Sequence, residues 1–428
     1  MGKNIEIIVR DNLCQGCGTC VSLCPKQAIR LTIDEEKGIY IPKIDRASCD
    51  NCGICFNCCP CAFDNLKFLN QVIFGRKPGD PLIGHFLNCY TGYAQDNDIR
   101  YHSSSGGVIT ALLIFALEEE IINGALVTRM QKNKPLEPAP FIARTRQEII
   151  EASRSKYCPV PANIALKEIL KSEPKEKFAI VGLPCHILGD RRAEQINKQL
   201  NEKIILRLGL FCNHNPNFHA TRIFLRKFNI QSKNIIKLHY RGQGWPGYMQ
   251  VIQADNKLKI PLREYWSFLG ATPFIANGCL ICNDQTAELA DISFGDPWLQ
   301  DFKSEKVGQS IIISRTQRGE EILQKAKKAK IIELNPVSEK KIISSQLSSI
   351  YLKKKNIRGL FGKKIFTNIL KPDFLDYLLA LLFKLEKFCF QNRWLVRLIP
   401  FKVFSFFNTA LNNLLYRKSL YDFKKYTE

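Results

Sequence analysis

The 428-residue sequence predicts an α+β fold built from a small cysteine-rich module, a larger mixed α/β domain and a basic helical tail. Three observations support this prediction. Eight cysteines repeat with one spacing before residue 60, strand and helix patterns alternate between residues 101 and 350, and residues 351–428 combine helical periodicity with many basic residues. We therefore expect domains at 1–68, 101–350 and 351–428, with a connector at 69–100.

One cysteine motif occurs twice in the N-terminal module. Cys-x2-Cys-x2-Cys-x3-Cys-Pro begins first at Cys14 and again at Cys49. Three thiolates at this spacing hold one iron–sulfur cube, and the fourth, just before proline, ligates the other cube. The first predicted 4Fe-4S cluster is held by Cys14, Cys17, Cys20 and Cys59. The second is held by Cys49, Cys52, Cys55 and Cys24.

The alternatives to iron–sulfur clusters are zinc and disulfide bonds. Structural zinc takes its ligands in pairs rather than in runs of four. Disulfides need an oxidising compartment, and residues 1–10 have no signal-cleavage pattern, so we expect a cytoplasmic protein. Cys58 lies beside Cys59, so a shift of the fourth ligand by one residue stays open.

The net charge of +22 is concentrated at the C-terminal end. Residues 351–428 contain 16 Lys and Arg against 5 Asp and Glu, a net charge of +11. Because no nucleic-acid-binding module accompanies this charge, we expect no nucleic-acid partner. No run of about 18 apolar residues predicts a membrane span. The tail either packs on the body as a helical subdomain or lies on an anionic membrane surface, and we favour peripheral contact with the inner membrane face.

The expected elements follow from the spacing of apolar residues. Residues 5–9, 29–33 and 39–41 are predicted strands of two hairpins in the N-terminal module. Glycines and prolines predict irregular structure through 70–100. Helices are expected at 108–119, 162–171, 218–228, 320–329, 373–390 and 394–415. Strands are expected at 124–128, 141–144, 178–182, 204–211, 235–240, 248–254, 290–294 and 311–314.

Four further cysteines in the α/β domain occupy positions that are compatible with a metal site. Cys185 and Cys212 each follow a predicted buried strand, where side chains meet at one edge of a sheet. Cys279 and Cys282 have the Cys-x2-Cys spacing of a metal-ligating pair. From the residues alone, a third metal site and four buried free thiols are both open.

Three polar motifs also fit a nucleotide or flavin. Ser103-Ser104-Ser105-Gly106-Gly107 precedes a helix. Its backbone N–H groups suit a phosphate, or the segment is an ordinary helix cap. Ser155-Lys156-Tyr157 combines a cation with an aromatic ring. Asp291 and Asp296 would hold a ribityl hydroxyl or ring N–H, or cap a turn.

Taken in order, these motifs resemble the family of beta subunits of coenzyme F420 hydrogenases and dehydrogenases, over residues 85–330. The resemblance implies a ferredoxin-like module followed by a mixed α/β flavin and iron–sulfur domain and, outside the resemblance, the basic helical tail. It implies a third 4Fe-4S cluster on Cys185, Cys212, Cys279 and Cys282. It also implies FAD bound by the two serine motifs, with Asp291 and Asp296 assigned to the same site. Leu183 and His186 replace the threonine and glutamine usual beside the family's cysteine.

We therefore predict an iron–sulfur flavoprotein oxidoreductase. Clusters pass single electrons and a flavin exchanges pairs, so such a chain links a ferredoxin-like donor or acceptor, or coenzyme F420, to an organic substrate. His186 and Lys156 are the predicted proton donors. The alternatives are an F420-reducing or F420-oxidising subunit of a larger hydrogenase or dehydrogenase, a reductase of surface-polysaccharide biosynthesis, and a non-catalytic electron-transfer adapter.

Overall fold

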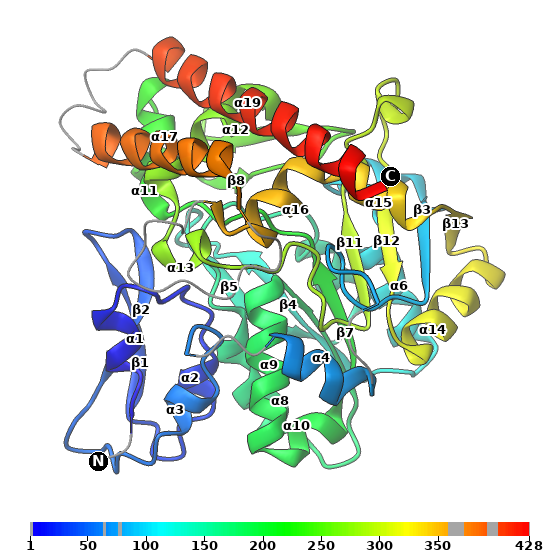
Figure 1. Cartoon of the computed structure of the whole chain (residues 1–428). Helices are drawn as coiled ribbons and strands as arrows, with labels where there is room; N and C mark the ends of the chain where they lie inside the picture. Colours follow the sequence, from blue (N-terminus) through cyan, green and yellow to red (C-terminus); the bar gives the residue numbers. More distant parts are fainter. Residues whose placement is uncertain (1–2, 63–65, 76–78, 358–371, 392–400, 428) are drawn as a thin grey trace.

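The computed structural model describes residues 3–62, 66–75, 79–357, 372–391 and 401–427. Figure 1 shows three regions: the N-terminal module at one side, the sheet domain in the centre, and two tail helices crossing the top. The predicted α+β class is confirmed. Within the described residues, no helix is long and apolar enough to cross a membrane.

An eight-stranded mixed sheet forms the centre of the molecule. Its order is β13-β3-β12-β11-β7-β6-β4-β5, and the four strands β11, β7, β6 and β4 run parallel. Antiparallel strands extend this parallel centre on both sides. The strands span Asn88–Ala94 (β3), Gly124–Met130 (β4), Pro138–Ala143 (β5), Phe178–Gly182 (β6), Ile204–Leu210 (β7), Ile292–Gly295 (β11), Ser310–Ser314 (β12) and Ile332–Pro336 (β13).

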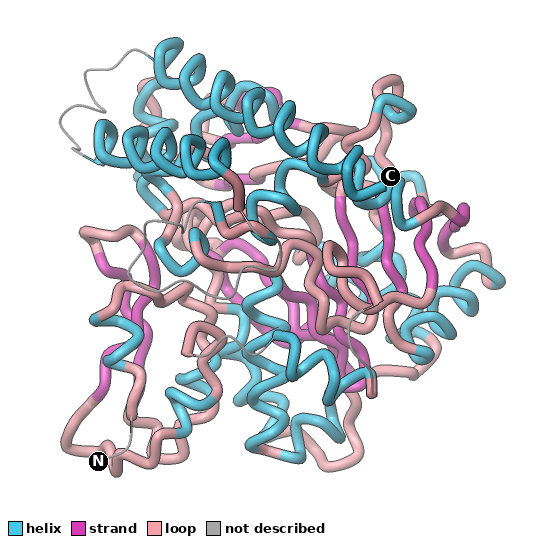
Figure 2. The backbone as a smooth tube through the Cα atoms, viewed as in Figure 1, coloured by secondary structure: helices cyan, strands magenta, loops and turns pink. Residues whose placement is uncertain are grey.

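Helices cover both faces of this sheet (Figure 2). Successive side chains of a strand point to opposite faces. Ile180 of β6 packs in the cluster that contains the helices α8, α9 and α10, whereas Ala179 packs with α6, α7 and α14. A sheet buried on both faces explains the continuous apolar runs of its strands. These helices span Leu166–Lys171 (α8), Pro184–Ile196 (α9), Lys198–Lys203 (α10), Val108–Glu118 (α6), Arg146–Glu151 (α7) and Gln317–Lys328 (α14).

The N-terminal module contains one hairpin where two were expected. Strands β1 (Ile29–Asp34) and β2 (Ile39–Ile44) pair antiparallel. The prediction of a strand at 5–9 is wrong, because this segment forms the helix α1 (Glu6–Arg10). The buried residues Ile5 and Ile8 are one helical turn apart and face the core together. Short helices α2 (Thr19–Ser22) and α3 (Ile54–Asn57) lie within the two cysteine motifs.

The stretch 70–100 is also more regular than predicted. It contains the end of α4 (Leu66–Phe74), the strand β3 and the helix α5 (Asn97–His102). Cys89, Tyr90 and Thr91 of β3 are all buried, because the strand lies inside the sheet between β12 and β13. Residues 79–84, which include Gly79, Pro81 and Gly84, form the turn region that was expected, but irregular structure ends before β3. The domain limits themselves stay a prediction.

A second, smaller layer supports the tail. Its three-stranded sheet contains β8 (Lys237–His239), β9 (Tyr248–Ile252) and β10 (Lys257–Pro261), accompanied by α11 (Phe218–Lys227) and α12 (Leu262–Leu269). The tail helices are α17 (Phe374–Gln391) and α19 (Phe401–Thr427), and α19 packs on α12 and α16 (Leu347–Lys354). The Asn408 amide of α19 donates to the Ser267 carbonyl at 2.6 Å. The tail therefore packs on the body. The predicted helical residues 394–400 lie outside the described residues.

Candidate functional site

The four cysteines of the predicted second cluster line one cavity at the edge of the N-terminal module. Cys24, Cys49, Cys52 and Cys55 surround it together with residues of the adjoining turns. Burial raises the pKa of the Cys55 thiol, and the neighbouring Cys52 and Cys24 contribute. Cys52 is exposed to solvent, so this group of thiols lies at the surface of the molecule.

The first predicted cluster has its four cysteines deeper in the module. Burial raises the pKa of Cys17 to about 11, followed by the effect of the Cys59 thiol. Burial, followed by the Cys59 thiol, also raises the pKa of Cys14. Cys17 and Cys14 both contribute to the raised pKa of Cys20. Thiols that raise one another's pKa lie close together, so the spacing rule brings these four residues to one place.

The neighbouring cysteines bear on the choice between Cys58 and Cys59, and Cys58 itself contributes to the raised pKa of Cys20. Cys59 raises the pKa of both Cys14 and Cys17, and a hydrogen bond with Cys61 lowers the pKa of Cys59 itself. The Cys58 thiol is fully buried and donates to the Cys55 carbonyl at 3.6 Å. This placement favours Cys59 as the fourth ligand.

Serine variants test this choice directly. Cys59→Ser should lower bound iron by about four atoms per chain, the content of one cube. Cys58→Ser is the matched control and should keep the wild-type content, since the Cys58 thiol donates to the Cys55 carbonyl and Cys59 is the predicted ligand. Iron and sulfide analysis after anaerobic purification measures both. The opposite pattern would assign the ligand to Cys58.

The third group of cysteines gathers at the carboxyl edge of the parallel strands. Cys185 lies in the first turn of α9 after β6, and Cys212 follows β7. Cys279 lies in α13 (Asn277–Leu280), with Cys282 just beyond it. Burial raises the pKa of Cys185, followed by contributions from Cys17, Cys279, Cys212 and Cys282. The two strand ends and the Cys-x2-Cys loop therefore converge as the sequence analysis expected.

Contacts join the first and third groups. Cys17 acts on the pKa of Cys185 more strongly than the other three cysteines of the third group do. The Gln15 amide, between two first-group cysteines, donates to the Gly278 carbonyl at 2.8 Å. A Cβ atom at Gly278 would lie 2.2 Å from the Leu13 carbonyl oxygen, so glycine permits this approach. The two cysteine loops are in direct contact.

The residues fit iron–sulfur cubes by ligand type. All twelve predicted ligands are thiols, the donor that iron–sulfur clusters require. Within the described part of the chain, no three His, Cys, Asp or Glu side chains stand close enough to hold a single metal ion.

The serine–glycine loop and the Ser155 motif are adjacent, as predicted. The Ser155 N–H donates to the Ser104 hydroxyl at 2.7 Å. A Cβ atom at Gly106 would lie 2.6 Å from the Gly92 carbonyl oxygen, so the loop presses directly on β3. Gly107 begins α6 with a φ of 75° and no side-chain hydrogen bond caps the helix. The first turn of α6 therefore has backbone N–H groups that fit a phosphate.

Lys156 and Tyr157 point into different surroundings. The Lys156 ammonium contacts three backbone carbonyls, those of Ala152, Ser153 and Arg154. Burial lowers its pKa to about 7. The Tyr157 ring lies 4.7 Å from the Trp266 ring, within an aromatic layer. Lys156 is therefore held by its own loop, whereas Tyr157 contacts the layer beneath the tail.

The two predicted aspartates do not share a site. Asp296 follows β11 and accepts two hydrogen bonds from the buried Arg241, at 2.6 and 2.8 Å, and one from Trp245 at 2.9 Å. Asp291 precedes β11, at the opposite edge of the sheet. Its carboxylate accepts from the Arg207 N–H at 2.7 Å and the Thr316 hydroxyl at 3.0 Å. The assignment of Asp291 to the flavin site is therefore corrected, because its oxygens serve a structural network.

The prediction that His186 donates protons is also corrected. Its Nδ1 accepts from the Leu183 N–H at 3.1 Å, so Nε2 carries the proton and donates to the Val160 carbonyl at 2.9 Å. Burial lowers its pKa to about 4. Both ring nitrogens are engaged with backbone, so His186 supports the first turn of α9 next to Cys185.

Two features of the site were not predicted from the sequence. Arg241, which pairs with Asp296, lies in a loop without a recognisable motif. Lys353 reaches the Cys282 thiol at 3.3 Å, although it belongs to a run of three lysines that resembles an exposed basic tail. The available signal was a lysine run in the last turn of a helix that begins with Leu347, Ile350 and Tyr351.

The fold and its cysteine groups define an iron–sulfur electron-transfer protein of the oxidoreductase class. Residues 13–63 match the family of 4Fe-4S dicluster domains. Residues 89–167 and 175–340 match the N-terminal and C-terminal families of the coenzyme F420 hydrogenase/dehydrogenase beta subunit. The chain belongs to this family of beta subunits.

Individual relatives agree with this assignment. The chain is 31% identical to the coenzyme F420 hydrogenase subunit beta of Methanothermobacter thermautotrophicus, over 61% of this chain and 88% of the relative. It is 28% identical to the coenzyme F420-dependent sulfite reductase of Methanocaldococcus jannaschii, over 74% of this chain and 46% of that protein. A chain of the F420-reducing [NiFe] hydrogenase complex from Methanosarcina barkeri superimposes with a TM-score of 0.53 and 27% identity, covering 68% of this chain and 98% of that one.

Proposed function

We propose that this chain is the F420-linked electron-transfer subunit of a larger oxidoreductase. Bound clusters would supply one-electron transfer, and FAD would supply exchange of an electron pair with coenzyme F420. One observation carries the proposal: the ligand loops of the first and third groups touch through Gln15 and Gly278, and the surface group belongs to the same module as the first group. Similarity to F420 hydrogenase beta subunits supports the choice of F420.

The proposed FAD site uses the residues that fit after the corrections. Ser103, Ser104, Ser105, Gly106 and Gly107 would form the loop that places the pyrophosphate at the uncapped start of α6. The Ser105 hydroxyl and the Gly106 N–H anchor this loop on Gln309 and Ser310, so the N–H groups of the first turn of α6 would bind the phosphate. Ser155, Lys156 and Tyr157 adjoin this loop through the Ser155–Ser104 hydrogen bond. Lys156 is the other predicted proton donor. Its ammonium donates to three backbone carbonyls, so release of one of these hydrogen bonds would provide a proton donor with a pKa of about 7.

The first test is anaerobic purification with iron, sulfide and released-flavin analysis. We expect about 12 iron atoms and one FAD per chain, the content of three cubes and one flavin site. Reduction of F420 by a reduced viologen dye then tests whether the protein passes electrons to F420. About 8 irons without flavin would instead support the non-catalytic adapter. A loaded protein inactive toward F420 but active on an organic substrate would support the stand-alone reductase.

Partner proteins would dock at the surface group of cysteines. The exposed Cys52 and the neighbouring Lys26 and Asp50 lie at the edge of the module, where a ferredoxin-like donor or another protein of the assembly has access. The relative from Methanothermobacter thermautotrophicus is named as a subunit, and the superimposed chain from Methanosarcina barkeri belongs to a hydrogenase complex. These names support a role within a larger assembly.

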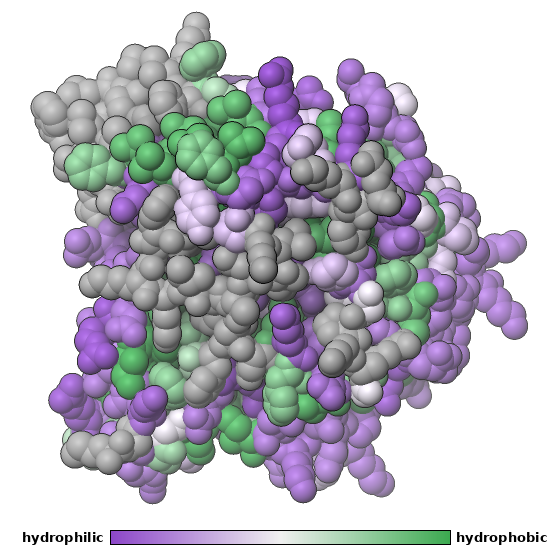
Figure 3. Space-filling view, viewed as in Figure 1, coloured by the Kyte–Doolittle hydropathy of each residue, from purple (hydrophilic) through white to green (hydrophobic). Residues whose placement is uncertain are grey.

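The tail helix α17 supports the proposed membrane contact. Its apolar residues on one side, Leu379 and Phe383, are buried against the body. A stripe on the other side is exposed and forms the apolar patch over α17 in Figure 3: Phe374, Leu375, Leu378, Leu381, Leu385 and Phe388. The exposed fractions of Phe374 and Phe388 are 75% and 77%, far more than an ordinary surface position requires. An apolar stripe within a strongly basic tail fits an anionic membrane surface.

Liposome flotation tests this contact. Leu381→Glu combined with Leu385→Glu should abolish most flotation with vesicles that contain anionic lipid, because each change places a carboxylate in the stripe. Ile236→Glu is the control, since Ile236 is 58% exposed but lies outside the tail. Wild-type protein that remains entirely with the unbound fraction would refute membrane contact.

A further inference from the structure

Three consecutive buried lysines at the end of α16 lie close to the third group of cysteines. The exposed fractions of Lys353, Lys354 and Lys355 are 4%, 0% and 5%. Lys354 pairs with Glu288, and Lys355 pairs with Asp376 at 2.7 Å. Two of the three lysines therefore have carboxylate partners, as buried cations require.

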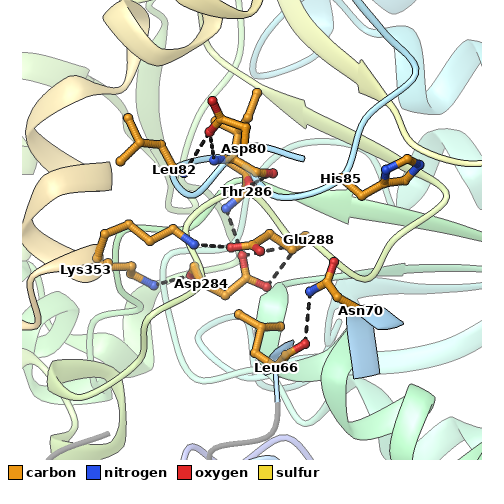
Figure 4. A network of polar contacts seen from close by, with 12 residues as sticks. Leu66, Asn70, Asp80, Leu82, His85, Asp284, Thr286, Glu288 and Lys353 are labelled. Atoms are coloured by element: carbon orange, nitrogen blue, oxygen red, sulfur yellow. Dashed lines mark hydrogen bonds and ion pairs between the residues drawn. The ribbon is translucent and has the colours of Figure 1, made fainter. Parts of the chain in front are cut away.

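Lys353 has a different environment. Its ammonium donates to the Asp284 backbone carbonyl at 2.7 Å and to the Cys282 sulfur at 3.3 Å. Figure 4 shows Lys353 reaching toward the Asp284 loop beneath α16. The Asp284 carboxylate is directed elsewhere, since it accepts the backbone N–H groups of Thr286 and Glu288 at 3.0 Å each. The Lys353 cation is thus held against a thiol that the third cluster would use.

We propose that Lys353 is a positioning residue that sets the reduction potential of the third cluster. The inference rests on the proposed function, because it needs a cluster on Cys185, Cys212, Cys279 and Cys282. Reduction adds one electron to the cluster and breaks no bond. A buried cation that donates to a ligand sulfur stabilises the more negative, reduced form and therefore raises the potential.

The location of Lys353 makes this effect strong and specific. Coulombic interactions are larger away from solvent, and Lys353 is almost completely buried. Its ammonium contacts Cys282, whereas the first group meets the third group at other residues, through Cys17 near Cys185 and through the Gly278 loop. A raised potential at the third site would favour electrons arriving there from the first group, so Lys353 would give the relay a direction.

Redox titration of the purified holoprotein, with dithionite as reductant and electron paramagnetic resonance as readout, tests the proposal. The third-cluster signal is identified as the one that Cys279→Ser removes. In Lys353→Met this signal should move to a more negative potential, while the two N-terminal signals stay unchanged. Lys355→Met is the matched control, because it removes a buried lysine of the same helix that pairs with the tail. It should leave all three potentials at their wild-type values.

The outcomes separate this inference from the proposed function. Wild-type protein with only about 8 irons would refute the third cluster itself. Wild-type protein with about 12 irons and an unshifted third signal in Lys353→Met would refute the role of Lys353 and leave the relay standing. Lys353→Arg retains a cation and should shift the potential less than Lys353→Met. Equal shifts in the two variants would show that packing, not charge, is responsible, which also overturns the proposal.

Discussion

Cys279→Ser should remove about four of about 12 iron atoms and stop electron transfer between the N-terminal clusters and F420. The physical reason is geometric. Cys279 belongs to the group that meets Cys185 and Cys212 at the strand ends, and this group is the one in contact with the first cluster site. Serine is a poorer ligand for iron than a thiolate, so the third cluster should be lost while the ferredoxin-like module remains loaded.

Two measurements check this expectation. Iron analysis counts the remaining clusters, and stopped-flow mixing with reduced viologen follows both the N-terminal clusters and F420. The clusters should still be reduced, but F420 reduction should fall by at least 100-fold, about 2.7 kcal/mol in activation free energy. Cys89→Ser is the control, since Cys89 is a buried core residue of β3. A Cys279→Ser variant with undiminished F420 reduction would exclude the third group from the electron path.

Arg207→Met should destabilise the sheet domain by about 3–5 kcal/mol, the usual loss when one partner of a buried ion-pair network is removed. Arg207 donates to Asp190 at 2.6 Å and to Glu194 at 2.5 Å, and all three side chains are at most 4% exposed. Arg191 joins the same network through Glu194 and Asp291. Methionine would leave the carboxylates of Asp190, Glu194 and Asp291 buried beside a single cation, Arg191.

Urea unfolding under anaerobic conditions measures this loss. Arg146→Met is the control, because Arg146 is 49% exposed and its ion pairs with Asp96 and Glu118 should contribute at most about 1 kcal/mol. Asp291→Asn provides a second check on the corrected assignment. It should lower stability while the folded protein keeps its flavin. Flavin loss without destabilisation would return Asp291 to the cofactor site.

The prediction of the eight N-terminal ligands rests on local information, and the match of residues 13–63 to 4Fe-4S dicluster domains agrees with it. The spacing from Cys14 to Cys24 determines which thiols face one cube, and no distant residue is needed for that inference. The third group needed the fold as well. Cys185 and Cys212 are brought together only because β6 and β7 run parallel and end at one edge, which the alternation of strands and helices indicates.

The errors have equally specific causes. Asp291 and Asp296 lie at the two ends of the four-residue strand β11. Their closeness in the sequence therefore does not bring their side chains to one site. His186 appeared reactive because it follows Cys185, but its hydrogen bonds depend on Val160, 26 residues away. The segment 5–9 has spacing compatible with either a strand or a short helix, and packing against the module decides between them.

The three lysines at the end of α16 limit how the tail can be exchanged between related proteins. They are Lys353, Lys354 and Lys355. Successive residues of a helix differ in direction by about 100°, so one turn of α16 contacts the Cys282 loop, the Glu288 core and the Asp376 and Asp422 carboxylates of the tail. The tail is therefore not a portable module. Lys353 and Lys354 contact the body and Lys355 contacts the tail, so a recombination breakpoint on either side of α16 would separate one set of partners. Tail sequence and cluster environment should consequently be inherited together.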